Sequence, residues 1–274
     1  MAEPGSAGPQ LLESLRDSVD AGVLLEDAAA AAPMLTDHHR RYQGRALAVA
    51  LPRSVAEVSK LLAWCNAHRV GVVPQGGNTG YCGGATPDES GRQVLIGLAR
   101  LNRVRALDAA NYSLTVEAGC TLQTVQQAAA AAGRCFPLEL GSAGSCQIGG
   151  NLATNAGGLN VLRFGMAREL TLGIEAVLAD GRVLQRLRSL RKDNSGYDLR
   201  GLLVGSEGTL GIITAATLRL WPQLRSTATA LVAVADVAAA MALLGALRST
   251  AGERINCFEL LPRSALELAQ RHLE

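Results

Sequence analysis

Glycine-rich stretches stand at three separated places in this 274-residue chain, at residues 76–84, 141–158 and 205–211. Glycine permits positive φ and lets a ligand approach the backbone where a Cβ would otherwise stand. Charged residues are sparse in all three stretches. We therefore expect them to converge on a surface of main-chain N–H groups that suits a large anionic ligand. The alternative is that they are only the turns of a glycine-rich fold.

Known nucleotide motifs and the overall charge narrow the choice of ligand. The chain contains neither G-x-G-x-x-G nor G-x-x-x-x-G-K-[ST], so it lacks the signatures of a Rossmann dinucleotide site and of a P-loop. A formal net charge of +2 gives no electrostatic case for a nucleic acid partner or an anionic membrane surface. The 48% hydrophobic content is ample for a globular core.

Cysteine usage and hydropathy predict a cytoplasmic protein without a transmembrane segment. The six cysteines form no C-x-x-C pair and follow no zinc-ribbon spacing, so free thiols in a reducing compartment are expected. The first ten residues do not resemble a signal peptide. Residues 228–247 are the most apolar stretch, but Asp236 interrupts them, and we interpret them as a strand followed by a helix.

Local patterns predict alternating helices and strands. Residues 1–45 are expected to be a Pro/Gly/Ser tail followed by an alanine-rich helical stretch, ending in a solvated turn at His38 and His39 rather than a metal site. Ser54 and Glu57 form a capping box for a helix over 54–69. Further elements are expected in the following order: strands at 72–74, 94–98, 104–107 and 113–118, a helix over 121–132 closed by Gly133, strands at 174–179 and 182–187 joined at Asp180-Gly181, and a strand from Ile212 to near Trp221.

Four longer motifs together resemble a known family. They are PQGGNTG at 74–80, GSCQIGGNLATNAGG at 144–158, LRKDNSGYDL at 190–199 and GSEGTLGIIT at 205–214. In this order they resemble flavoproteins of the vanillyl-alcohol oxidase (PCMH) type, with the D-lactate and D-2-hydroxyglutarate dehydrogenase branch as the nearest likeness. The resemblance covers residues 46–274. It implies an α+β fold, in which residues 1–45 are a tail and helical segment, 46–223 a PCMH-type FAD-binding domain of two α/β subdomains, and 224–274 the incomplete start of a substrate-binding cap.

The resemblance also implies which residues hold FAD. The first loop would donate backbone hydrogen bonds to the pyrophosphate, the second would line the phosphates, ribityl chain and isoalloxazine edge, and the third would lie at the adenine and ribose end. The implied cofactor-binding residues are Pro74, Gln75, Gly76, Gly77, Asn78, Thr79, Gly80, Gly83, Gly84, Gly144, Ser145, Gly149, Gly150, Asn151, Thr154, Asn155, Gly158, Glu207, Gly211 and Ile213. Neutral backbone donors suit a diphosphate.

Several side chains near these motifs have open roles. Covalently flavinylated relatives carry a histidine where this chain has Asn78, so the resemblance implies non-covalent FAD. Cys82 and Cys146 are either flavin-linked or redox thiols, or small residues that fill tight loops. Arg163, Arg191 and Lys192 either stabilise reduced flavin or are solvated side chains.

By resemblance, the chain is an FAD-dependent dehydrogenase that oxidises a D-2-hydroxy acid such as D-lactate or D-2-hydroxyglutarate and passes the electrons to an acceptor that the sequence does not identify. No catalytic base and no metal ligand is assigned, because the four histidines lack the family's His-x-His context. Two alternatives stay open: a catalytically incomplete FAD-binding subunit that needs a partner chain, and a module for another nucleotide. A homodimer is also open.

Overall fold

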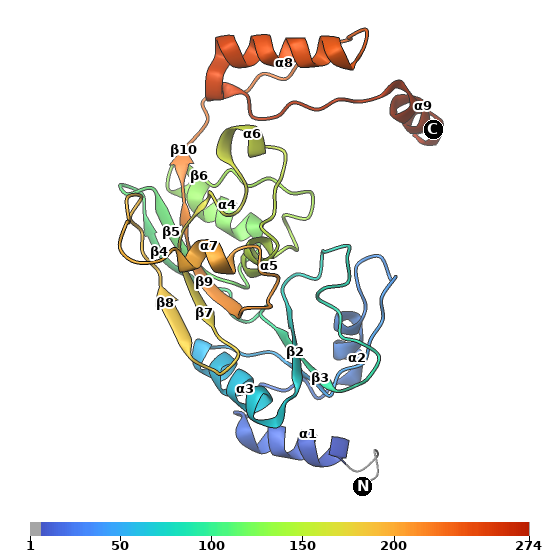
Figure 1. The fold of residues 1–274 in the computed structure, drawn as a ribbon, viewed down its shortest axis with the longest axis vertical. Helices are drawn as coiled ribbons and strands as arrows, with labels where there is room; N and C mark the ends of the chain where they lie inside the picture. The colour runs from blue at the N-terminus through green and yellow to red at the C-terminus, as the bar shows by residue number, and fades with distance from the viewer. Residues whose placement is uncertain (1–6, 274) are drawn as a thin grey trace.

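The computed structural model describes residues 7–273, and two sheets form its frame (Figure 1). The smaller sheet is parallel, with the order β1 (Ala48–Ala50), β3 (Gln93–Gly97), β2 (Gly71–Gln75). Parallel strands present their carboxyl ends at one edge, so the loop after β2 is held at that edge. This loop is the first glycine-rich stretch.

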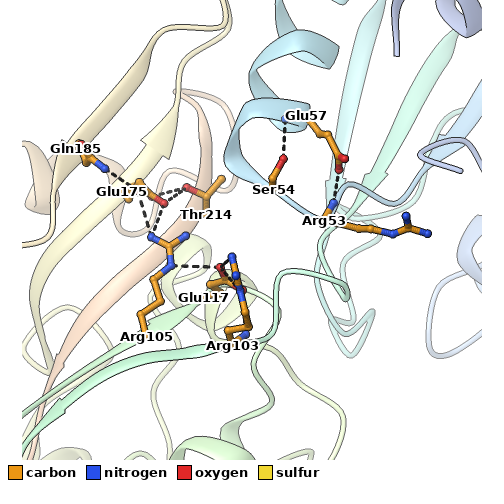
Figure 2. Close-up of polar contacts among 9 residues, drawn as sticks. All are labelled: Arg53, Ser54, Glu57, Arg103, Arg105, Glu117, Glu175, Gln185 and Thr214. Carbon is orange, nitrogen blue, oxygen red and sulfur yellow. Dashed lines mark hydrogen bonds and ion pairs between the residues drawn. The ribbon is translucent and has the colours of Figure 1, made fainter. Parts of the chain in front are cut away.

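Helix α3 (Val55–His68) packs against the smaller sheet and begins as the sequence predicts. The Ser54 side chain accepts a hydrogen bond from the Glu57 N–H at 3.2 Å, while the Glu57 carboxylate accepts one from the Arg53 N–H (Figure 2). In the expected capping box the Glu57 carboxylate would accept a hydrogen bond from the Ser54 N–H. It accepts from the N–H of Arg53 instead, one residue earlier in the chain. Leu61 and Val58 of α3 are buried against Val94 and Ile96 of β3.

The larger sheet is antiparallel and has five strands. Its order is β4 (Val104–Asp108), β5 (Ser113–Glu117), β9 (Ile212–Arg219), β7 (Thr171–Val177), β8 (Val183–Arg186). The hairpin expected at Asp180-Gly181 is confirmed by the antiparallel pairing of β7 with β8, but its loop has three residues instead of two, because the Leu178 N–H donates to the Arg182 carbonyl at 2.9 Å. Gly181 has φ of 86°, which is typical of the last residue in such a loop.

One face of the larger sheet carries the main core. Residues such as Leu114, Val116 and Ile174 pack there against α4 (Leu122–Ala131) and α5 (Ile148–Ala153). The short elements α6 (Val161–Phe164), α7 (Leu199–Leu203) and the pair β6 (Arg134–Cys135) and β10 (Trp221–Pro222) complete this subdomain. A second cluster contains Ala118, Val177 and Ile212 together with α3, and it joins the two sheets.

The opposite face of the larger sheet buries two carboxylates. Glu117 and Glu175 lie on either side of Ala215 in the strand register, and both are almost fully buried. Arg105 bridges them, with its Nε 3.2 Å from Glu117 Oε1 and its Nη1 3.1 Å from Glu175 Oε1 (Figure 2). Arg103 Nη2 donates to Glu117 Oε1 at 2.9 Å. Burial by itself raises the pKa of Glu117, but the hydrogen bonds from Arg103 and Arg105 outweigh it, so the net pKa is lowered.

The two ends of the described chain depart from the sequence predictions. Helix α1 (Ala7–Ser18) begins within the expected Pro/Gly/Ser tail, of which residues 1–6 lie outside the described part; it is followed by α2 (Ala28–Ala31) and η1 (Ala32–Leu35). The strand expected from residue 228 is also wrong, since residues 228–236 have no ladder partner among the described residues. Asp236 instead caps α8 (Val237–Ala251), which η2 (Gly252–Arg254) and α9 (Arg263–His272) follow in an arm that extends from β10 (Figure 1).

Candidate functional site

The three glycine-rich stretches converge, as the sequence predicts. We call residues 74–84 the first loop, 141–158 the second and 205–211 the third. The first follows β2, the second leads into and out of α5, and the third leads into β9. Their positions are thus fixed by the ends of elements in both sheets.

The first and second loops lie in direct backbone contact. A Cβ on Gly76 would stand 3.4 Å from the N atom of Gly150, and one on Gly77 would stand 2.0 Å from the carbonyl oxygen of Ser145. Only glycine at position 77 allows this approach. The two loops therefore form one continuous main-chain surface.

The third loop is hydrogen-bonded to the end of α5 and touches the first loop. The Gly205 N–H donates to the Leu152 carbonyl at 2.9 Å, and the Glu207 N–H donates to that of Ala153 at 2.8 Å. A Cβ on Gly208 would stand 2.6 Å from Cγ of Pro74. The first and third loops consequently both lie against the second loop, which contains α5.

Each loop contains one non-glycine residue in the left-handed conformation. These residues are Asn78 (φ 51°), Asn155 (φ 47°) and Glu207 (φ 51°). The Asn78 side chain donates to the Thr36 carbonyl at 2.8 Å, and the Asn155 side chain accepts from the Arg168 N–H at 2.9 Å. A left-handed residue turns successive N–H groups toward one side, which is how backbone nests bind anions.

Two kinds of glycine can be separated in these loops. Some are required by packing within the protein, because an added Cβ would collide with backbone or side-chain atoms; these are Gly77, Gly83, Gly149, Gly158 and Gly211. By contrast, a Cβ on Gly80, Gly141 or Gly150 would meet no described atom within 4 Å outside its immediate neighbours, and none of these residues has positive φ. If the loops were only turns of the fold, the glycines required by packing would be explained. The glycines that face open space would have no reason within the protein to lack a side chain.

The side chains of several predicted site residues are directed into the protein. Gln75 Nε2 donates to the carbonyls of Met34 and Ala85, each at 2.8 Å. Asn151 is buried and Ile213 belongs to the main core. Thr154 Oγ1 donates to the Gly150 carbonyl at 2.9 Å. Gln75, Asn151 and Ile213 are thus enclosed by the protein, whereas Thr154 is exposed and its hydroxyl bonds within its own loop.

Arg168 is a structurally important residue that the sequence motifs do not reveal. Its guanidinium donates to the carbonyls of Gly201 and Val204, at the end of α7, while its own N–H is held by Asn155. It therefore ties the second loop to the entrance of the third. Only its position shortly after the glycine motif could have marked Arg168 in the sequence. Its hydrogen-bond partners lie more than 30 residues away in the chain, so no local pattern predicts them.

A cavity of about 270 Å³ lies beside the third loop. Pro74, Gly208 and Ile212 line it together with Asn66 and Arg69 at the end of α3. Its walls are mixed apolar and polar, which suits a flat heterocycle with a polar edge.

The other side chains singled out by sequence have ordinary surroundings. His38 and His39 pack against Tyr81, with ring centroids 5.9 and 4.5 Å apart, at the edge of the first loop. Cys146 is buried and Cys82 is exposed. Arg163 donates to Asn256 at 3.0 Å, whereas Arg191 and Lys192 are exposed. Within residues 7–273 no group of three or more His, Cys, Asp or Glu side chains is placed to hold a metal ion.

The loops fit a large phosphate-containing ligand. The N–H groups of residues 77–80 donate no hydrogen bond to any described residue. Three side-chain atoms beside the loops are buried and likewise lack a partner in the described chain: Thr86 Oγ1, Gln147 Oε1 and Ser206 Oγ. Buried polar atoms are nearly always paired in native proteins, so these atoms indicate a ligand or ordered water. Neither Thr86, Gln147 nor Ser206 was predicted from the sequence.

Comparisons with known proteins agree with this geometry. The model of a family described as FAD binding domain matches residues 46–186. D-2-hydroxyglutarate dehydrogenase of Xanthomonas citri pv. viticola is 40% identical over 96% of this chain and 55% of its own length. The mitochondrial D-2-hydroxyglutarate dehydrogenase of Arabidopsis thaliana is 41% identical over 87% of this chain and 42% of its own length. The chain spans about half the length of the curated relatives it matches.

A solved structure shows the same fold. An alkyldihydroxyacetonephosphate synthase superposes with a TM-score of 0.70 over 82% of this chain and 42% of its own, at 22% identity. The expected α+β class and PCMH-type FAD-binding fold are thus confirmed, with one parallel and one antiparallel subdomain. No helix among residues 7–273 is long and apolar enough to cross a membrane.

Proposed function

This chain belongs to the family of FAD-binding domains, and from that premise we propose that it is the cofactor-binding part of a dehydrogenase for D-2-hydroxy acids. The bound FAD supplies a two-electron acceptor for the hydride of the substrate α-carbon. The names of the relatives support D-2-hydroxyglutarate as the substrate, with D-lactate as the second acid to test. The electron acceptor is unassigned, and so are a catalytic base and a metal ligand.

The observation that carries the cofactor assignment is that two of the open glycines, Gly80 and Gly150, lie on the backbone surface formed by the first and second loops. Gly80 and Gly150 have no steric reason within the protein to lack a side chain, and both border the N–H groups of the first loop. Glu207 is the one charged residue within the three loops. A surface of neutral donors with space above it suits the diphosphate of FAD.

We propose that the twenty residues named from the motifs line this cofactor. Residues 76–80 lie at the pyrophosphate and 144–158 at the ribityl chain and ring edge. Glu207, Gly211 and Ile213 lie at the adenine end, and the cavity at Gly208 supports this placement. FAD is held without a covalent bond, since position 78 is an asparagine whose amide is already bonded to Thr36.

We propose that the FAD-binding domain covers residues 46–223 and that residues 224–274 begin a substrate-binding cap. The arm exposes large apolar side chains, for example Leu231 (88% exposed), Val237 (61%) and Met241 (60%). Several large exposed apolar side chains on one segment favour packing against further protein or a ligand. For location we propose a reducing compartment such as the cytoplasm, because all six cysteines are free thiols.

The first test is spectroscopic and uses the whole chain. We expect the purified protein to bind added FAD with a visible flavin spectrum, and acid precipitation to release all of the flavin into the supernatant. A folded protein that fails to bind FAD contradicts the cofactor assignment. Flavin that stays with the precipitate contradicts only the non-covalent mode.

The second test concerns the substrate. We expect anaerobic addition of D-2-hydroxyglutarate to bleach the bound flavin, with L-2-hydroxyglutarate as the matched control that does not. D-Lactate is compared at the same concentration. If FAD binds and neither D-acid bleaches it, turnover by this chain alone is contradicted and the catalytically incomplete FAD-binding subunit is favoured, while the cofactor assignment stands.

A further inference from the structure

Gln147 has an unusual combination of burial and missing hydrogen bonds. It is 9% exposed, and its Oε1 atom is buried with no partner among the described residues. The other unpaired buried atoms belong to Thr86, Ser206 and Trp221, whose residues are only partly buried. Gln147 is therefore the most enclosed unpaired side chain in the described chain.

The backbone around Gln147 fixes the direction of its side chain. Its neighbours Cys146 and Ile148 belong to the main core. The Ile148 N–H donates to the Cys120 carbonyl at 2.9 Å, and the Gln147 carbonyl accepts from the Asn151 N–H at 3.0 Å. Because successive side chains of an extended segment point to opposite sides, Gln147 points away from the core.

The side on which Gln147 lies is the surface between the first and second loops. A Cβ on Gly76 would stand 3.6 Å from Cβ of Gln147 and 3.4 Å from the N atom of Gly150. Cβ of Gln147 thus lies beside Gly76, at the start of the loop whose following N–H groups we assign to the diphosphate of FAD.

A second buried glutamine shows what a purely structural role looks like. Gln75, 2% exposed, donates to the carbonyls of Met34 and Ala85 and thereby holds the first loop to its neighbours. Gln147 makes no such side-chain bond within the described residues. A buried carboxamide oxygen without a donor destabilises the protein, so its retention indicates a donor from outside the chain, either a ligand or an ordered water.

We infer that the Gln147 carboxamide contacts the bound cofactor and accepts a hydrogen bond from one of its hydroxyl groups. The phosphates next to it carry acceptors only, so the nearest donors on either side of the diphosphate are hydroxyls of the ribityl chain and of the adenosine ribose. Gln147 thereby distinguishes a dinucleotide with intact sugar hydroxyls from a simple phosphate anion. This inference rests on the proposed FAD site.

The test measures FAD affinity and apoprotein stability together. Gln147→Met keeps the volume of the side chain and removes the acceptor, and Gln127→Met, at an exposed position of α4, is the matched control. We expect Gln147→Met to weaken FAD binding about tenfold by isothermal titration, which is about 1.4 kcal/mol. We expect its apoprotein to unfold at the same or a higher temperature than wild type, and the control to bind FAD as wild type does.

Two analogues identify the hydroxyl. One is FAD whose ribityl chain lacks its three free hydroxyls, and the other is FAD with 2′,3′-dideoxyadenosine. The analogue that lacks the contacted hydroxyl is expected to bind wild type and Gln147→Met equally, while the other keeps the tenfold difference.

The inference is overturned if Gln147→Met binds FAD like wild type, if its apoprotein is clearly less stable, or if both analogues keep the full difference. These outcomes leave the proposed FAD site intact, because wild type still binds the cofactor. A wild-type protein that does not bind FAD overturns the proposed function and this inference with it.

Discussion

The backbone of Gly77 lies so close to Ser145 that a Cβ at position 77 would stand 2.0 Å from the Ser145 carbonyl oxygen. This contact joins two loops that are separated by more than 60 residues in the sequence. The first loop is consequently a packed part of the fold as well as a candidate ligand surface.

Gly77→Ala is therefore expected to destabilise the apoprotein. The added methyl would also approach Cys146 Cα at 2.9 Å, and neither backbone atom can move without displacing the second loop. Overpacking of this kind costs about 2 kcal/mol or more, measurable by urea unfolding. Gly141→Ala, where a Cβ meets no described atom within 4 Å, is the control and should unfold like wild type. Equal stability of the two variants would contradict this packing.

Gly150→Ala is expected to have the opposite effect on the apoprotein. Gly150 lies in α5, and replacing a helical glycine by alanine stabilises by up to about 1 kcal/mol. The same methyl would occupy the space that we assign to FAD, so affinity should fall at least tenfold. Thermal unfolding without FAD and titration with FAD separate the two effects. Unchanged FAD affinity would remove Gly150 from the site.

Glu117→Gln is expected to destabilise the protein in a pH-dependent way. The pKa of Glu117 in the folded protein is lowered. The ionised carboxylate therefore stabilises the folded state at pH values above the unfolded pKa, and this stabilisation is lost as the pH falls through the folded pKa. Neutralising one member of this buried network should cost about 3 kcal/mol at pH 7. The difference in free energy of unfolding between variant and wild type should narrow below about pH 4.5, where the Glu117 carboxylate of the unfolded wild-type chain becomes protonated. Urea unfolding from pH 7 to pH 3 measures it.

The control for Glu117 is Asp180→Asn, which removes an exposed pair with Arg182. Exposed pairs contribute little to stability, so this variant should follow wild type at pH 7. A pH-independent gap for Glu117→Gln would show that lost packing, rather than lost charge, explains its effect.

Cysteine reactivity should follow burial. Burial raises the pKa of the Cys65 thiol to about 12 and that of Cys120 to about 11, so almost no thiolate is present at pH 8. Cys82 and Cys257 are exposed. We expect labelling with a thiol reagent, mapped by mass spectrometry, to modify Cys82 and Cys257 in the native protein, and Cys65 and Cys120 only after unfolding. Rapid native labelling of Cys65 would contradict the packing of α3.

Much of the fold could be predicted from local patterns. The Ser54 cap, the apolar run before Gly76 and the alternation at 113–117 are local signals, and each element forms where it was expected. The predictions failed where pairing decides the structure. Residues 228–236 have a strand pattern but no partner strand in the described chain. The hairpin at Asp180 was predicted, but the length of its loop is set by the register of β7 and β8.

For the candidate site, the sequence by itself determined its chemistry: three glycine-rich loops with sparse charge, in an order that resembles FAD-binding proteins. Only the tertiary structure decided which glycines serve packing and which face open space, because that depends on atoms distant in the chain, such as Ser145 for Gly77 and Ala118 for Gly149. Burial of Gln147 beside Gly76 was likewise invisible to local patterns, since a polar residue between Cys146 and Ile148 has no periodicity that marks it. Hydrogen-bond satisfaction is a property of three-dimensional surroundings, and it is what distinguishes Gln147 from Gln75.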